Sequence, residues 1–305
     1  MRLSYQHAQG ADNGLTRWLP TTAPSVWKEK PMSVRDGLAP SSTSTSTSTS
    51  TSTRALWVWD VSTPAATVEL AAANGIVSLF VAVPPRLPES PLLPRLQELS
   101  QRARAAGIRV DALGGDPGWL HSLRWVVADW LRPAMGTGLF TGVHVDLEPY
   151  TTPDWRTDRA GVVHRCLDTL SVLVEAAKPA QVEADIPFWF HEVPAGRSTL
   201  DREVITRAAG VSVMAYRNTA AVADGTIALA TPALMAATEL GKPARVGQET
   251  TRLGSDPAQA RQTFHGWTRS SMEAELAEVD AAFSGLAGYA GVALHDATGY
   301  AAMAP

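Results

Sequence analysis

From residue 55 onward, the sequence alternates short apolar runs of β-forming residues with longer stretches of helical character. Such alternation is typical of a parallel sheet whose strands are joined by crossover helices. Eight of these units predict a (β/α)8 barrel, an α/β fold. A doubly wound sheet usually has a glycine-rich loop after its first strand, and "WVWDVSTP" (57–64) has none. The eight runs are "ALWVWD" (55–60), "GIVSLFVAV" (75–83), "GIRVDAL" (107–113), "GVHVDLE" (142–148), "QVEADIPF" (181–188), "GVSVMAY" (210–216), "ARVGQET" (244–250) and "GYAGVALH" (288–295).

Seven helices are predicted between these runs. The fourth has the clearest pattern, because Thr152 is suited to cap a helix, Pro153 suits the first helical position, and apolar residues then recur at helical spacing as far as Ala177. The predicted ranges are 64–74, 91–106, 118–131, 153–178, 199–209, 226–240 and 271–283.

Residues 41–53, "SSTSTSTSTSTST", form a Ser/Thr tract that cannot bury enough apolar surface to fold. We therefore predict a disordered N-terminal region over 1–53, with 41–53 as its linker, and a barrel domain over 54–305. The first twenty residues lack the apolar core of a secretory signal, which predicts a cytoplasmic protein. Because such tracts often tether exported or cell-surface domains, export remains the alternative if the N-terminus is misassigned.

Composition narrows the classes of partner. The 305 residues are 45% hydrophobic, enough for one large core, and the net charge of −4 with no dense basic block does not indicate a nucleic-acid partner. No run of 18 apolar residues predicts a membrane span. No His-x-His closes the first strand and His144, His191 and His295 fall in three different units, so neither a metal site nor another cofactor is expected. Oligomeric state is not encoded in any recognisable pattern.

Active sites of (β/α)8 barrels lie at the carboxyl ends of the strands, which form the mouth of the barrel. In the fourth run, side-chain alternation places His144, Asp146 and Glu148 on one face and apolar residues on the other. The apolar face must pack against helices, so the polar face points into the barrel with Glu148 nearest the mouth. Two such close carboxyls repel when ionised, which predicts a raised pKa for one of them. That arrangement suits general-acid catalysis.

The structural alternative for Asp146 is a salt bridge within an ionic layer inside the barrel. Charged residues that fall in or beside predicted strands could form such a layer: Arg109, Asp111, Glu183, Asp185 and Arg245.

Two short motifs resemble those of family 18 glycoside hydrolases, the chitinases and endo-N-acetylglucosaminidases. "TGVHVDLE" resembles the end of the family's "DGxDxDxE" signature, and "MAYR" (214–217) resembles its "MxYD" motif. The resemblance implies that Glu148 protonates the glycosidic oxygen, Asp146 orients a substrate acetamido group acting as internal nucleophile, and Tyr216 steadies the intermediate. Four positions depart from the family pattern: Thr141, His144, Arg217 and His295.

A second route needs no acetamido group. Glu249 ends the seventh strand, and the pair Glu148 and Glu249 resembles the acid and nucleophile of the large barrel clan of retaining glycosidases. Carboxyls about 5 to 5.5 Å apart would allow a covalent retaining mechanism, whereas about 6.5 to 9.5 Å would favour inversion. Glu148 is the acid in either route.

A carbohydrate is the expected partner, because aromatic side chains at the mouth can stack on sugar rings, above all Trp59 and Trp189. The alternative function is a non-catalytic, chitinase-like lectin, but such lectins commonly replace the acid that Glu148 provides here. The residues predicted to contact substrate are Trp59, Asp60, His144, Tyr150, Trp189, Arg217 and His295.

Overall fold

The computed structural model describes residues 53–305. The predicted disordered region lies outside the described residues except for Thr53, which is the first residue of strand β1 rather than the last of a linker. The boundary predicted between two regions of the chain therefore stays a prediction.

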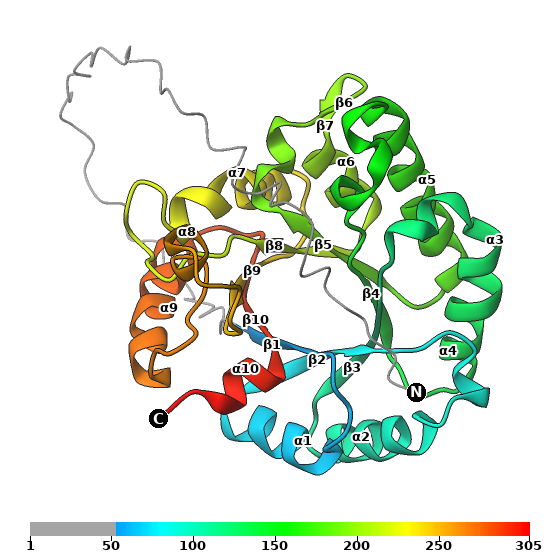
Figure 1. Ribbon diagram of the computed structural model, residues 1–305, viewed down its shortest axis with the longest axis horizontal. Coiled ribbons are helices and arrows are strands. Elements are labelled where there is room, and N and C mark those ends of the chain that lie inside the picture. Colours follow the sequence, from blue (N-terminus) through cyan, green and yellow to red (C-terminus); the bar gives the residue numbers. More distant parts are fainter. Residues whose placement is uncertain (1–52) are drawn as a thin grey trace, which may run out of the picture. The chain divides into compact units, whose positions relative to one another are not determined.

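Eight parallel strands close into a barrel in the order in which they follow one another in the chain, which confirms the predicted fold (Figure 1). Each predicted run overlaps one of them, although β1 begins before its run and β3 ends one residue after its run. A two-stranded antiparallel hairpin of β6 (Pro194–Ala195) and β7 (Ser198–Thr199) is inserted after the fifth barrel strand. The barrel strands are β1 (Thr53–Val58), β2 (Ile76–Ala82), β3 (Arg109–Gly114), β4 (Gly142–Val145), β5 (Val182–Pro187), β8 (Gly210–Met214), β9 (Ala244–Glu249) and β10 (Tyr289–His295).

Helices surround this barrel on the outside (Figure 1). Each predicted helical range overlaps at least one observed helix, and α4, α8 and α10 lie outside the predicted ranges. The helices are α1 (Pro64–Ala73), α2 (Leu93–Ala105), α3 (Leu123–Trp125), α4 (Arg132–Gly136), α5 (Arg159–Ala177), α6 (Leu200–Arg207), α7 (Thr226–Glu239), α8 (Pro257–Ala260), α9 (Arg269–Phe283) and α10 (Ala297–Ala302).

Two helix boundaries differ from the prediction. Residues 153–156 form a separate 3-10 turn, and α5 begins only at Arg159, where the Asp158 carboxylate accepts a hydrogen bond of 3.0 Å from the Gly161 amide. Asp158, not Thr152, therefore caps the helix. The range 118–131 begins in another 3-10 turn, Pro117–His121, and helical structure then runs through α3, a π-helical segment (Val126–Leu131) and α4.

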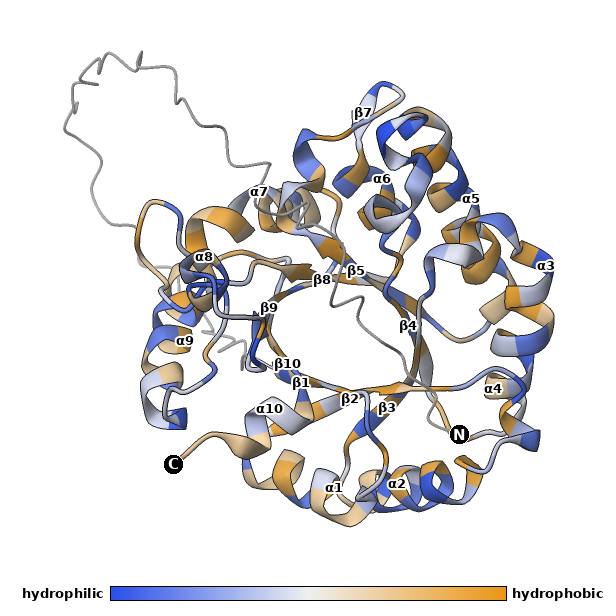
Figure 2. Cartoon of the chain, viewed as in Figure 1, coloured by the Kyte–Doolittle hydropathy of each residue, from blue (hydrophilic) through white to orange (hydrophobic). Residues whose placement is uncertain are grey.

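Strand alternation divides the apolar residues into two clusters. Outward-facing residues such as Leu56 and Val58 join the large core between sheet and helices. Inward-facing residues form a small cluster inside the barrel: Ala55, Trp57, Phe80, Leu113 and Ala293, with Trp59 packed against them. Figure 2 shows the strands mostly in hydrophobic colours and the surrounding helices in mixed ones. The barrel interior is thus a packed core, and solvent-accessible polar side chains are expected at its mouth, the carboxyl ends of the strands.

A layer of charged side chains lies inside the barrel at the end opposite the mouth. Arg109 lies 2.6 Å from Asp111 and 2.7 Å from Glu183, and Arg245 lies 2.6 Å from Glu183. Burial alone would raise the pKa of Glu183, but Arg245, Arg109 and then His144 outweigh it and lower that pKa to about 2. The ionic layer considered as the alternative for Asp146 is present, but among the described residues Asp146 forms no ion pair with it.

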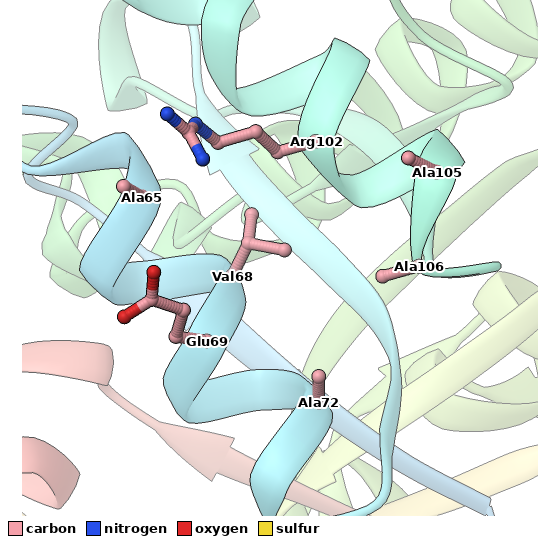
Figure 3. A pocket seen from close by; sticks show the side chains of 7 residues that line it. All are labelled: Ala65, Val68, Glu69, Ala72, Arg102, Ala105 and Ala106. Atoms are coloured by element: carbon pink, nitrogen blue, oxygen red, sulfur yellow. The ribbon is translucent and has the colours of Figure 1, made fainter.

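A groove of about 360 Å³ lies between α1 and α2 and contains none of the strand-end residues (Figure 3). Small side chains such as Ala72, Ala105 and Ala106 line it together with Glu69 and Arg102. Among residues 53–305, no helix is both long enough and apolar enough to span a membrane.

Candidate active site

The loop that follows β4 carries the two carboxyls of "DLE". β4 ends at Val145, and the Asp146 amide still donates a hydrogen bond of 3.0 Å to the carbonyl of Gly114 at the end of β3. Gly115 packs directly against this loop, since a Cβ placed there would lie 1.9 Å from the Asp146 carbonyl oxygen. The glycine therefore allows the β3 and β4 loops to touch, and this contact fixes the position of Asp146.

Asp146 is the carboxyl whose pKa is raised. Burial is the largest cause, followed by the negative charges of Glu148 and Asp185. Its Oδ1 atom is buried and has no hydrogen-bond partner within the described part of the chain. Asp146 therefore holds a proton to higher pH than an ordinary aspartate does.

Glu148 is half-buried and accepts a hydrogen bond from the Tyr150 hydroxyl. Burial, and then the charges of Glu148 and Asp146, raise the pKa of Tyr150, so its hydroxyl stays protonated and remains a donor. Tyr150 in turn meets Trp189 edge to face, with ring centroids 5.2 Å apart. Glu148 is thus held by an aromatic group at the rim of the barrel.

His144 points into the barrel as predicted, but it lies beneath the mouth. It is fully buried, stacked on Phe80 with ring centroids 3.7 Å apart, and its Nε2 lies 2.7 Å from Asp185 Oδ1. A position in direct contact with substrate does not fit a side chain that is 0% exposed. In this structure His144 contributes to the barrel interior that supports the mouth.

Asp185 is the residue whose importance the sequence did not reveal. Its Oδ2 accepts a 3.1 Å hydrogen bond from the Trp57 indole, and its Oδ1 pairs with His144. Its charge also acts on Asp146. The alternation of Glu183 and Asp185 marks both as inward-facing, but their partners depend on the register between β4 and β5, which sets His144 opposite Glu183.

Tyr216 follows β8 and lies among carboxyl groups. Burial is the largest cause of its raised pKa, and the charges of Glu249, Asp185, Asp146 and Glu148 raise it further. The phenol therefore stays protonated. It brings one hydrogen-bond donor into a region with a negative electrostatic potential.

Glu249 is the last residue of β9 and is 1% exposed. Its Oε1 accepts hydrogen bonds from the Thr250 amide at 2.9 Å, the Thr251 amide at 2.6 Å and the Thr251 hydroxyl at 2.7 Å. Its Oε2 lies 2.8 Å from Nδ1 of His295. Burial alone would raise the pKa of Glu249, but His295 and Thr251 outweigh it and lower that pKa. Glu249 is therefore an ionised carboxylate with both oxygens engaged.

His295 ends β10 and connects Glu249 to Trp59. Its Nε2 accepts a 2.8 Å hydrogen bond from the Trp59 indole, so the hydrogen of the neutral ring is on Nδ1 and faces Glu249. Burial alone would lower the pKa of His295, but the charge of and hydrogen bond to Glu249, and then Asp296 and Asp185, raise it.

The remaining predicted substrate contacts lie on the rim. Trp59 and Trp189 are half-buried, and the Arg217 guanidinium stacks 5.9 Å from the Phe188 ring centroid. Asp60 is exposed, and its carboxylate accepts two hydrogen bonds from Ser62 in the loop after β1. Within residues 53–305, no group of three or more His, Cys, Asp or Glu side chains is arranged to hold a metal ion.

Comparison with known proteins found similarity in structure alone. No protein-family model matches the sequence, and no curated protein matches it. A mutant class V chitinase from the plant Cycas revoluta, solved in complex with (GlcNAc)3, superposes with a TM-score of 0.57 at 12% identity, covering 81% of this chain and 95% of that one.

Two further solved structures are similar at the same level. The spore cortex-lytic enzyme SleL of Bacillus megaterium QM B1551 has a TM-score of 0.51 at 12% identity, with 80% of this chain and 70% of that chain covered. A GH113 β-1,4-mannanase has a TM-score of 0.53 at 10% identity, with 82% and 89% covered. The chain spans about half, 52%, of the SleL of Bacillus cereus. These similarities show that the chain has the (β/α)8-barrel fold found in these glycoside hydrolases.

Proposed function

We propose that the protein is a glycoside hydrolase in which Glu148 is the general acid. The observation that carries the proposal is the pair of carboxyls after β4: the charge of Glu148 and burial raise the pKa of Asp146, and the Tyr150 hydroxyl donates a hydrogen bond to Glu148. The same barrel architecture in solved chitinases and a mannanase supports it. A carbohydrate is accordingly the proposed substrate.

The charges around Tyr216 suit the chemistry of glycoside cleavage. Its pKa reflects four surrounding carboxyl groups, from strands β4, β5 and β9 or the loops that follow them. The sugar ring acquires positive, oxocarbenium-like charge as the glycosidic bond breaks. The negative charges of Glu249 and Asp185 stabilise that positive charge in a partly buried site, and Glu148 supplies the proton that the departing oxygen needs.

Of the two routes to the intermediate, the geometry favours the one that uses Asp146. Glu249 is 1% exposed and both of its oxygens accept hydrogen bonds, so a sugar carbon has no access to it without rearrangement. Asp146 has a buried oxygen with no hydrogen-bond partner among residues 53–305, and its raised pKa favours the protonated form, which can donate to a polar substrate group. We therefore propose a substrate with an N-acetyl group, which Asp146 and Tyr216 orient as the internal nucleophile.

A screen of aryl glycosides and oligosaccharides tests the proposal. Wild-type protein should cleave oligomers of N-acetylglucosamine in preference to oligomers of mannose, whose sugars lack the acetamido group. Glu148→Gln should abolish cleavage and leave the thermal unfolding midpoint nearly unchanged, because Glu148 lies at the half-exposed rim. Full activity in Glu148→Gln would refute the assignment. Binding of these oligosaccharides by wild-type protein without any cleavage would instead indicate the lectin alternative.

A further inference from the structure

A chain of hydrogen bonds holds the indole of Trp59 at the mouth of the barrel. Trp59 follows β1 and donates from Nε1 to His295 Nε2 at 2.8 Å, and His295 Nδ1 donates to Glu249 Oε2 at 2.8 Å. Three neighbouring strands, β1, β10 and β9, thus contribute one member each. The chain links a half-buried aromatic ring at the rim to a carboxylate in the interior.

Glu249 is the fixed end of this series of hydrogen bonds. Its second oxygen is fixed by two backbone amides and the Thr251 hydroxyl, so the carboxylate cannot rotate away from His295 without breaking three hydrogen bonds. A carboxylate can only accept, and this forces the hydrogen of neutral His295 onto Nδ1. Nε2 is then the acceptor that Trp59 requires.

The ring of His295 is also enclosed by aromatic neighbours. Its centroid lies 5.7 Å from that of Trp57, 6.0 Å from that of Trp59 and 6.1 Å from that of Tyr216. Trp59 itself packs on the interior cluster that contains Trp57 and Phe80. The indole plane is therefore oriented by packing from below and by one directional bond to His295.

We propose that Glu249 and His295 are positioning residues that hold Trp59 as an aromatic wall for a sugar ring, and that this wall is released when His295 is protonated. The inference rests on the proposed function only in naming a sugar as the occupant. It assigns Glu249 a role other than nucleophile, and it assigns His295 a role through Trp59 instead of direct contact with substrate.

Protonation opposes the bond to Trp59 for a simple reason. A second proton on the imidazole occupies Nε2, which then faces the indole N–H with another donor. The charged and titratable groups around His295 are Glu249 on β9, Asp296 next to it, Asp185 on β5 and Tyr216 after β8. Because the carboxylates raise its pKa above the ordinary value of 6.5, the bond should be lost as pH falls through a value higher than that of a free histidine.

The indole signals of the full-length protein, labelled with ¹⁵N-tryptophan, provide a test that needs no substrate. The Trp59→Phe variant identifies the Trp59 signal by its disappearance. In wild-type protein we expect the Trp59 Nε1–H signal to shift along a single titration curve as pH is lowered. His295→Gln cannot titrate, so the signal should not shift with pH in that variant. His265→Gln, which alters an exposed histidine, should titrate like wild-type protein.

The Glu249→Gln variant tests whether Glu249 positions Trp59 through His295. A glutamine keeps an acceptor oxygen for the amides of residues 250 and 251 but offers His295 an N–H, which forces the imidazole hydrogen onto Nε2 and breaks the bond to Trp59. We expect its Trp59 signal at neutral pH to match that of acidified wild-type protein. With chitotriose as the probe, its dissociation constant should rise about tenfold, the effect of one lost oriented contact, and Trp59→Phe should show a similar rise.

Three results would overturn the inference. The first is a Trp59 signal in wild-type protein that does not respond to pH. The second is the same response in His295→Gln, and the third is an unchanged Trp59 signal in Glu249→Gln. If the indole responds as expected but neither chitotriose nor a mannose oligomer binds, the hydrogen bonds from Glu249 through His295 to Trp59 are supported and the proposed function is refuted. If Glu148→Gln loses activity while the Trp59 indole does not respond to pH, the proposed function is supported and the proposed role of Glu249 and His295 is refuted.

Discussion

At the scale of single residues, neighbouring groups shift the pKa values of two buried carboxyls of the same site in opposite directions. Asp146 and Glu249 are both strongly desolvated. The negative charges of Glu148 and Asp185 raise the pKa of Asp146 further, whereas His295 and three donors from residues 250 and 251 surround Glu249 and lower its pKa. The sequence predicted that one carboxyl of the "DLE" pair would have a raised pKa. It placed Asp185 only among candidates for the ionic layer, because the partners of that side chain come from β1 and β4.

Replacing Asp146 by Asn should make the protein more stable at neutral pH. The folded-state pKa of Asp146 lies above its usual 3.8, so the native state holds the proton that the unfolded chain releases, and stability falls as pH rises through that interval. Asparagine resembles the protonated form and has no such cost. Thermal unfolding midpoints should therefore coincide below about pH 4 and separate as pH rises. Asp224→Asn, at an exposed position, is the control; a pH-independent difference for Asp146→Asn would contradict the raised pKa.

At the scale of elements, the periodicity of the sequence was sufficient to locate every barrel strand. Alternation along 142–148 also assigned His144 correctly to the barrel interior. Helix boundaries were less predictable, because Thr152 and Asp158 are both competent caps and only the intervening 3-10 turn decides between them. Contacts between loops were not predictable either, since that of Gly115 with Asp146 depends on how two strand ends are offset.

Gly115→Ala should disturb the site through the backbone. The added methyl would meet the Asp146 carbonyl oxygen at 1.9 Å, so the β3 or β4 loop must move. We expect a loss of about 2 kcal/mol in the free energy of unfolding, typical of overpacking, together with a loss of activity. Gly136→Ala is a matched control at the end of α4, where a Cβ meets nothing within 4 Å. Equal stability of the two variants, measured by urea unfolding, would show that the loops do not constrain each other.

At the scale of the whole molecule, the barrel interior is layered. Charged residues fill the end opposite the mouth, the cluster around Trp57 and Phe80 fills the middle, and the candidate site lies at the mouth. His144 joins these layers, because it stacks on Phe80, pairs with Asp185 and lies 4.0 Å from Glu183. The sequence predicted the polar mouth, and it offered the ionic layer as an alternative position for Asp146. The link between them depends on strand register and could not be predicted.

Arg245→Met should destabilise the whole barrel, because Glu183 keeps Arg109 but loses its other cationic partner. Breaking a buried ion pair on one side costs about 3 to 5 kcal/mol. The pKa of Glu183 is about 2 when folded against a usual 4.5, so its stabilising effect is full above 4.5 and declines as pH falls toward 2. Acid unfolding of Arg245→Met should therefore begin at higher pH than in wild-type protein. Adding Glu183→Gln should recover part of the loss at pH 7; no recovery would argue against the pairing.

The central claim, that Glu148 is a general acid, is tested most directly by comparing two leaving groups. A sugar alkoxide must be protonated as it departs, whereas a 2,4-dinitrophenolate needs almost no protonation. For Glu148→Gln we predict that cleavage of an N-acetylglucosamine oligomer falls by about a thousandfold, while cleavage of the matching 2,4-dinitrophenyl glycoside falls by less than about tenfold. Equal losses on both substrates, or no loss on either, would contradict the account.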